Sequence, residues 1–387
     1  MNKGKYVFAQ LVEFLPQRVF DRMVLNHSGN KYIKHFSCWN QLLCLIFGQL
    51  SDRESLRDLA IIIEAHQSKT YHLGLGRNIS RSNLSKANEN RSYKIFEEFA
   101  YHLIGLAQAK NSNDDFEIKG KIYAFDATTI DLCLSVFYWA NFRKNKAGIK
   151  LHTQFEINTQ VPVFIHFTNA NVHDVNAMDF IKYEQNAYYI FDKAYVDFFR
   201  LFAITQANAF FVIRAKTNLK FRRIYSQKTD RLSGVIYDQI GKLTNKKALK
   251  NYPKKLRKIK FYDKETNKTF VFLTNNFDLT ALQIALLYKR RWQIELFFKW
   301  IKQHLKVKTF WGTSENAVRI QINIAIITFC LVSILAKDLK INRTNYEILQ
   351  ILSVSLLDKT AVNELLIKSD YNDVNELDSN QLNFSLF

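Results

Sequence analysis

The stretch YKRRWQIELFFKWIKQHL, residues 288–305, carries polar side chains at a spacing that suits one side of a helix. With about 100° between successive residues, Tyr288, Arg291, Glu295 and Lys302 fall within an arc of roughly 60°. The opposite side is apolar and contains Leu287, Ile294, Phe297, Phe298, Ile301 and Leu305. The pattern predicts a single helix, anchored by its apolar face, that presents a carboxylate between cations. A solvated helix without any chemistry has the same pattern, so Glu295 needs acidic partners elsewhere.

Two aspartates are candidates for these partners. Asp126 follows the apolar run IYAF and Asp192 follows YYIF, so each is expected where a buried strand ends. Aspartate is disfavoured inside strands and costly to bury alone, although either residue could simply begin a turn. Carboxylates are ligands for Mg²⁺, and two such ions can activate water and stabilise the leaving oxygen of a phosphodiester. We therefore predict that Asp126, Asp192 and Glu295 together hold two Mg²⁺ ions.

The charge of the chain points to a polyanionic partner. The 387 residues include 55 lysines and arginines against 35 acidic residues, a net charge of +20 that is spread over the whole length. Nucleic acid and anionic membrane surfaces both attract such a chain. The N-terminal MNKGKYVFAQLVEFLPQ does not resemble a signal peptide. The most apolar run, residues 320–336, contains Gln321 and Asn323 and is too short to span a bilayer, so we expect a buried helix.

The cysteines and histidines do not suggest a metal or disulfide framework. Cys38, Cys44, Cys133 and Cys330 form no CxxC pair, and the nine histidines form no HxxxH cluster. Neither a zinc site nor a disulfide framework is predicted, which fits a reducing cytoplasm.

The pattern along the chain changes several times. Residues 1–110 are predicted to be helical throughout, with Ser51 and Glu54 as a capping box that opens one helix. Short apolar runs and one helix in residues 121–214 predict an α/β segment. Residues 215–275 suggest a strand-rich insertion, residues 276–340 hold the helix with Glu295, and residues 341–387 form a helical tail.

The order Asp126, Asp192, Glu295, with the glutamate inside Y-x2-R-x3-E-x6-K, resembles the catalytic signature of the DDE transposases of bacterial insertion sequences. More narrowly, it is similar to the insertion-sequence-four family, which is defined by that Tyr, Arg, Glu and Lys pattern. Four further stretches resemble that family: FSCWNQLLCLIFGQLSDRESLRDL, FYWANFRKNKAGIKLHT, TNANVHD and FWGTSENAVRIQI.

The resemblance implies an α/β fold with a ribonuclease-H-like core. Asp126 would lie on the first strand, Asp192 at the end of the fourth and Glu295 on a late helix, with a strand-rich domain inserted in the 103 positions between the last two. It also implies cut-and-paste transposition, in which a 3′-hydroxyl freed at the element's end attacks target DNA, often through a hairpin. The implied partners are double-stranded DNA, namely the terminal inverted repeats and the target, and a second copy in a DNA-bound homodimer. The resemblance implies no membrane, and Mn²⁺ could substitute for Mg²⁺. The enzyme would act in the bacterial cytoplasm, on the nucleoid.

Several residues are candidates for DNA contacts. Tyr288, Arg291, Lys299 and Lys302 are predicted to hold phosphates beside the scissile one. Trp292 could stack on an unpaired base, but an ordinary place at the edge of the core is the preferred interpretation. Arg143 and Lys144 begin one basic run, and residues 242–260 form a second run with nine basic residues. Each run is predicted to bind phosphates, with a solvated basic loop as the alternative. The segment SRSNLSKANENR within the N-terminal helices is predicted to read base edges, with a helical scaffold as the alternative.

Two other functions use the same features. A nuclease with this core would cut DNA without joining it, and its residues would look the same. A domesticated DNA-binding protein would keep the fold without chemistry, but such proteins usually lose one of the acids. All three acids are present here, which favours the transposase.

Overall fold

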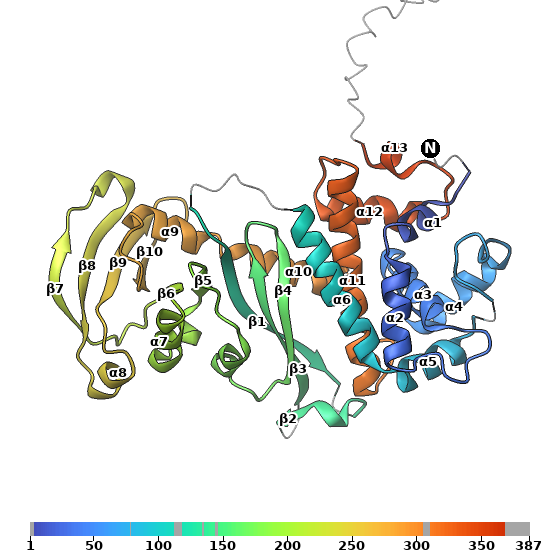
Figure 1. Ribbon diagram of the computed structural model, residues 1–387, viewed down its shortest axis with the longest axis horizontal. Coiled ribbons are helices and arrows are strands. Elements are labelled where there is room, and N and C mark those ends of the chain that lie inside the picture. The colour runs from blue at the N-terminus through green and yellow to red at the C-terminus, as the bar shows by residue number, and fades with distance from the viewer. Residues whose placement is uncertain are drawn as a thin grey trace, which may run out of the picture.

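The computed structural model describes residues 4–77, 79–111, 118–133, 135–143, 146–304 and 310–367. Helices gather at one end of the molecule and a large sheet forms the other (Figure 1). The helical end contains α1 (Val7–Val12), α2 (Gln17–Asn26), α3 (Cys38–Leu50), α4 (Leu56–Ala65), α5 (Arg81–Asn90) and α6 (Tyr93–Lys110). It also contains three helices from the other end of the chain: α11 (Glu315–Asp338), α12 (Asn345–Ser355) and α13 (Val362–Leu366).

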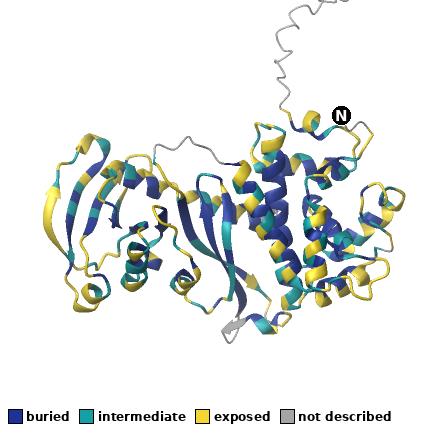
Figure 2. Ribbon diagram, in the orientation of Figure 1, coloured by how far each residue is buried: buried dark blue, intermediate teal, exposed yellow. Residues whose placement is uncertain are grey.

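Helix α11 is the buried helix that the sequence predicts. By length and composition it could cross a membrane, but 94% of its apolar window is buried inside the protein. It packs against α6 and α3 and is dark blue along most of its length in Figure 2. Its polar residues have partners within the fold: Gln321 Oε1 accepts from the Trp311 amide, and Asn323 donates to the Arg319 carbonyl. The N-terminal helices therefore share a core with the segment that follows the Glu295 helix.

Apart from a three-residue strand described below, five strands of the sheet come from the segment predicted to be α/β. They are β1 (Ile122–Leu132), β3 (Lys146–Glu156), β4 (Val161–Asn169), β5 (Tyr188–Phe191) and β6 (Phe210–Arg214). Strands β1, β3 and β4 pair antiparallel, whereas β5 runs parallel to β1 and β6 parallel to β5. The order across the sheet is β4-β3-β1-β5-β6, with short β2 (Asn141–Arg143) beside β3. Helix α7 (Phe198–Gln206) makes the crossover between β5 and β6.

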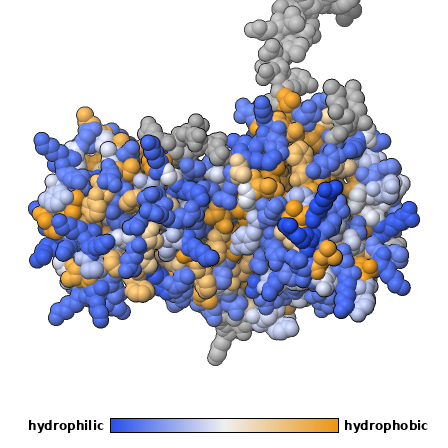
Figure 3. All heavy atoms as spheres, in the orientation of Figure 1, coloured by the Kyte–Doolittle hydropathy of each residue, from blue (hydrophilic) through white to orange (hydrophobic). Residues whose placement is uncertain are grey.

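The strand-rich segment continues the same sheet. Strand β10 (Lys268–Thr274) pairs antiparallel with β6, and β9 (Leu256–Asp263), β8 (Val235–Leu243) and β7 (Phe221–Gln227) follow in order. Helix α8 (Lys246–Asn251) lies between β8 and β9 in the chain. Hydrophilic side chains prevail over this end on the face drawn in Figure 3.

Two local predictions about helices are wrong. The helix expected over 288–305 is divided into α9 (Ala281–Lys289) and α10 (Trp292–His304). At the junction, the amides of Arg291 and Ile294 donate hydrogen bonds to the carbonyls three residues earlier, and not four as in an α-helix. The apolar face is nevertheless buried as predicted at Leu287, Ile294, Phe297, Phe298 and Ile301, while Leu305 lies outside the described residues. The expected capping box at Ser51 is absent, because Ser51 ends α3 and Ser55 caps α4 by accepting from the Asp58 amide at 3.1 Å.

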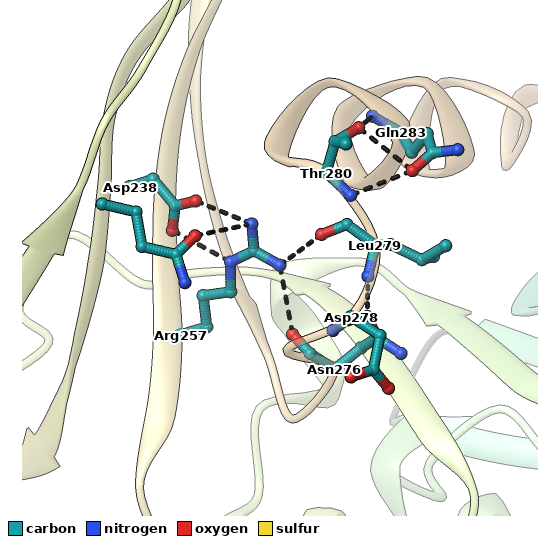
Figure 4. A network of polar contacts seen from close by, with 8 residues as sticks. Asp238, Arg257, Asn276, Asp278, Leu279, Thr280 and Gln283 are labelled. Carbon is teal, nitrogen blue, oxygen red and sulfur yellow. Dashed lines mark hydrogen bonds and ion pairs between the residues drawn. The ribbon is translucent and has the colours of Figure 1, made fainter.

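A buried arginine fixes the start of α9 (Figure 4). Arg257 on β9 donates to both carboxylate oxygens of Asp238 on β8, at 2.9 and 2.6 Å. A third contact runs from Arg257 to the Leu279 carbonyl at 2.5 Å, one residue before the N-cap Thr280. We call these contacts the Arg257 clamp. The clamp ties the outer strands to the helix that leads to Arg291 and Glu295, so the basic run at 242–260 contains one residue with a structural role.

Candidate active site

Asp126 and Asp192 lie side by side on neighbouring parallel strands. Phe125 of β1 is paired with Phe191 of β5, so the next residue on each strand is an aspartate, about 5 Å apart between backbones. Asp192 follows the last residue of its strand, as predicted. Asp126 does not end its strand, because β1 continues to Leu132 through pairing with β3. Its side chain reaches the sheet edge because the neighbouring strand β5 stops there.

Glu295 reaches the same place from the first turn of α10, which packs against β1. One arginine connects it to the first aspartate: Arg291 Nη1 donates to Asp126 Oδ2 at 2.9 Å, and Nη2 donates to Glu295 Oε1. The exposed fractions of these side chains are 22% for Asp126, 15% for Arg291 and 32% for Glu295. A half-buried guanidinium thus bridges Asp126 and Glu295, which are 169 positions apart in the chain.

Tyr288 completes the contact network from the end of α9. Its hydroxyl donates to Asp192 Oδ1 at 3.5 Å, a long hydrogen bond, and its ring packs against Phe272 of β10. Burial raises the pKa of Tyr288 to about 12, so the hydroxyl stays protonated. The structure therefore brings Tyr288, Arg291 and Glu295 to the two aspartates, although the tyrosine and the glutamate belong to different helices.

The network holds more negative charge than the arginine can balance. The pKa of Asp126 is raised to about 6, mainly by burial and in part by the charges of Glu295 and Asp192. The Ala127 amide and Arg291 oppose this rise. Burial lowers the pKa of Arg291, but its anionic neighbours outweigh that effect and raise it overall. Three carboxylates face one guanidinium, so the site favours a further cation.

Tyr195 was missed by the sequence reasoning. Its hydroxyl is buried and has no hydrogen-bond partner among the described residues, and the same is true of Thr153 Oγ1, which sits opposite Asp126 in the strand ladder. Burial first, and then the charges of Asp126, Asp174 and Asp192, raise the pKa of Tyr195. The available signal was its position three residues after Asp192.

The donor set fits a hard divalent ion. Carboxylate oxygens are the ligands that Mg²⁺ prefers, and the unpaired Tyr195 and Thr153 hydroxyls could bond to its water ligands. Among the described residues, however, no three His, Cys, Asp or Glu side chains are grouped closely enough to hold a metal. Because Arg291 lies between Asp126 and Glu295, these two carboxylates can share an ion only after the guanidinium turns away.

The other predicted DNA-binding residues are dispersed around this network. Lys302 is half-buried on α10, and Lys299 is exposed and faces a separate cavity. Trp292 is 59% exposed, so the preferred placement at the edge of the core is wrong. Arg143 belongs to β2, and Lys144 lies outside the described residues.

Comparison with known proteins decides the family. The family model described as "Transposase DDE domain" matches residues 117–331, a range that contains all three acids. A protein of Sinorhizobium fredii that bears a transposase name is 34% identical over 271 residues, which cover 69% of this chain and 74% of that protein. The chain belongs to the DDE transposases of bacterial insertion sequences. The predicted resemblance to that family is thereby confirmed.

Further similarities are found with other transposases and with a second family model. A Geobacillus stearothermophilus protein named as a transposase for insertion sequence element IS5377 is 28% identical over 65% of this chain and 66% of its own length. A Synechocystis protein named for element IS4SA is 23% identical over 73% of this chain and 80% of its own length. Residues 3–76 match the model of a domain of unknown function. The solved piggyBac transposase synaptic complex with hairpin DNA covers 98% of this chain and 84% of its own, at 10% identity and a TM-score of 0.45.

Proposed function

We propose that this transposase cuts the ends of its own insertion sequence and joins the freed 3′-hydroxyl to target DNA, as a cut-and-paste enzyme of the insertion-sequence-four family. The observation that carries the proposal is the convergence of Asp126, Asp192 and Glu295 from three elements on Arg291 and Tyr288. The Y-x2-R-x3-E-x6-K spacing supports the narrower family assignment. The work would take place in the bacterial cytoplasm, on double-stranded DNA and as a homodimer on that DNA.

The sheet supports a ribonuclease-H-like core for this enzyme. Three antiparallel strands precede two parallel ones in the order β4-β3-β1-β5-β6, with Asp126 on the first strand of the chain and Asp192 after the fourth. Counting β1, β3, β4 and β5 gives that fourth position, since β2 is a three-residue addition beside β3. Residues 121–214 and 276–340 would form the two parts of the core and residues 215–275 the insertion.

Asp126, Asp192 and Glu295 are the residues that would hold two Mg²⁺ ions, or Mn²⁺ in their place. When bound, such ions supply an activated water and stabilise the leaving oxygen of an in-line displacement. Arg291 neutralises Asp126 and Glu295 and, once released from them, can grip a phosphate with two donors. The protonated Tyr288 hydroxyl holds Asp192 in place. Lys302, on the same side of α10 as Glu295, would fix a neighbouring phosphate.

The direct test separates chemistry from DNA binding. The substitutions Asp126→Ala, Asp192→Ala and Glu295→Ala each remove one acid while leaving the basic surface intact. We expect strand cleavage at a labelled element end to fall by at least about a thousandfold, with end binding changed less than about threefold. Strand joining is scored in the same reaction with a precut end. Cleavage by the Asp192→Ala protein at the wild-type rate contradicts the proposal, and cleavage without any joining by the wild type identifies a nuclease.

A further inference from the structure

A cavity of about 1040 Å³ lies on the side of α10 that faces away from the three acids. Its walls come from α10, the end of α11, the start of α12, the turn between β3 and β4, and Asn111 after α6. We call it the rear cavity. Its volume is at the upper end of the range for small-molecule pockets.

The rim of the rear cavity is cationic. Lys299, Lys337, Lys340 and Arg343 line it, and no aspartate or glutamate is among its lining residues. Arg343 is held in place by the Leu366 carbonyl at 2.8 Å, whereas Lys299 and Lys340 are exposed to solvent. Arg343 also pairs with Glu347 at 3.9 Å, so the rim is not free of acids, but its several cations still attract an anion that binds here.

The interior of the rear cavity is aromatic, with polar atoms that lack partners. Trp300 and Phe329 meet edge to face at 4.7 Å, and Phe155 and Phe297 line the same wall. Within the described chain, Trp300 Nε1, Gln293 Oε1 and Asn158 Oδ1 are buried without a hydrogen-bond partner. One donor and two acceptors beside aromatic rings suit a nucleobase, which offers both kinds of group at its edge and a flat face for stacking.

An exposed path joins the acids to the rear cavity around α10. Gln293 and Trp300 lie roughly 150° around the helix from Glu295, and Trp292 and Lys299 lie between them. Trp292 is 59% exposed on this path. Lys299 is four residues after Glu295, about 6 Å along the axis.

We propose that the rear cavity binds an unpaired stretch of DNA strand, with bases against Trp300 and Phe329 and phosphates on Lys299, Lys337 and Lys340. A duplex is too wide to enter the cavity, so the site selects strands that have separated next to the cleavage point. The choice of DNA as the ligand rests on the proposed function, but binding to the rear cavity does not require cleavage. The same residues would give the enzyme a place to hold one strand while the other reacts.

The first experiment measures how much the lysines of the rim contribute to binding of single-stranded DNA by the full chain. The probe is a labelled oligothymidylate of about ten nucleotides, compared with a duplex of equal length and with thymidine monophosphate. The double substitution Lys299→Gln/Lys340→Gln should raise the Kd for the single strand about tenfold and lower its salt slope by about 1.4, the value for two lost phosphate contacts. The matched Lys299→Arg/Lys340→Arg protein should bind like wild type. Equal losses on duplex and single strand, or no loss, overturn the proposal.

The second experiment locates the bases. Quenching of tryptophan fluorescence by the oligothymidylate is compared in Trp300→Phe and Trp292→Phe, two conservative changes whose melting temperatures are checked first. Smaller quenching in Trp300→Phe supports the rear cavity. Loss of quenching only in Trp292→Phe places the strand outside on α10 and refutes it, and monophosphate binding as tight as the oligonucleotide's indicates an effector site instead. In Glu295→Gln, single-strand binding should persist without cleavage, so failure of the proposed function is recognised separately.

Discussion

Arg257 and Arg291 of this transposase both bind carboxylates, yet their surroundings differ. Arg257 and Asp238 have side chains that are 2% and 3% exposed, and the guanidinium of Arg257 is shared among Asp238, two backbone carbonyls and Gln227. Arg291 is 15% exposed, bridges two acids, and keeps an Nε without a partner among the described residues. Every guanidinium nitrogen of Arg257 therefore has a hydrogen-bond acceptor, whereas the guanidinium of Arg291 does not have its full set.

The difference separates a structural ion pair from a functional one. A saturated buried pair gains nothing from a ligand, because each donor already has an acceptor and each charge is matched. The network around Arg291 has three acids for one cation, a raised pKa at Asp126 and spare donors, all of which a phosphate or metal would satisfy. Surplus charge beside unpaired polar atoms is therefore the mark that distinguishes the active site from the Arg257 clamp.

The largest effect on stability is expected at the Arg257 clamp. Arg257→Leu leaves Asp238 buried without its partner, which should lower the free energy of unfolding by about 3–5 kcal/mol. The double variant Arg257→Leu/Asp238→Leu should recover much of this loss, because buried charge and partner disappear together. Urea unfolding of both proteins and of Arg291→Leu measures the comparison. A loss as large in Arg291→Leu as in Arg257→Leu would remove the distinction between the two arginines.

A smaller effect of opposite sign is expected at Asp126. Its pKa rises from the ordinary 3.8 to about 6 on folding, so the folded protein binds the proton more tightly and loses stability as the pH rises through this range. Asp126→Asn removes the charge and should raise the free energy of unfolding by roughly 2 kcal/mol at pH 7.5, with little change near pH 4. Urea unfolding across this pH range tests it, with Asp131→Asn, at an exposed position of the same strand β1, as the control. A stabilisation that does not depend on pH contradicts the assignment.

Lys302 should affect rate without affecting the fold. If it holds a phosphate near the cleavage point, Lys302→Ala slows single-turnover cleavage by a factor of about ten or more, because a misplaced phosphate costs rate steeply. The free energy of unfolding should change by no more than about 0.5 kcal/mol. Lys302→Arg serves as the matched control that keeps the charge. Wild-type cleavage by the folded alanine protein on saturating DNA shows that the lysine is an ordinary surface residue.

The smallest effects are expected at α5, in the helical region. Because α11 packs on α6 and α3, point substitutions test this region better than removal of residues 1–110. Asn83→Ala should cost about 1 kcal/mol of discrimination between the element's end and random DNA if the side chain reads a base edge. Lys86→Ala should weaken both complexes equally and reduce the salt slope by about 0.9. If neither protein differs from wild type in competition binding, α5 is scaffold.

The sequence predicts elements and acids better than it predicts their junctions. Short apolar runs located β1 and β5, and the helical spacing of apolar residues located the buried face of α10, because buried positions require apolar side chains. The break at Arg290 and Arg291 was not predicted, since a helical wheel continues through a junction where amides bond three residues back. The sequence predicts a strand that ends at Asp126, whereas β1 continues to Leu132. Only the pairing with β3 extends β1 beyond the end of β5, and this pairing cannot be seen in the sequence.

Roles of single basic and aromatic residues were the least predictable. Arg257 sits in a run of nine basic residues, and only the position of Asp238 on the neighbouring strand shows that it is buried. Trp292 has the same sequence context as a core tryptophan, but the junction before α10 turns it to solvent. Tyr195 needed three-dimensional proximity to the acids to be noticed. Each of these depends on contacts between residues far apart in the chain.

The unbroken sheet has a mechanical consequence. Neighbouring strands of a sheet are rotated by about 20–25°, so the eight steps from β4 to β7 turn its surface through roughly 160–200°. With this average twist, the same face of the sheet points in nearly opposite directions at β4 and at β7. Because backbone hydrogen bonds run through every step, a twist applied at β7 is carried as torque to β5 and β1. Asp126 lies on β1 and Asp192 directly follows β5, so a rotation of the outer strands moves both aspartates with the sheet.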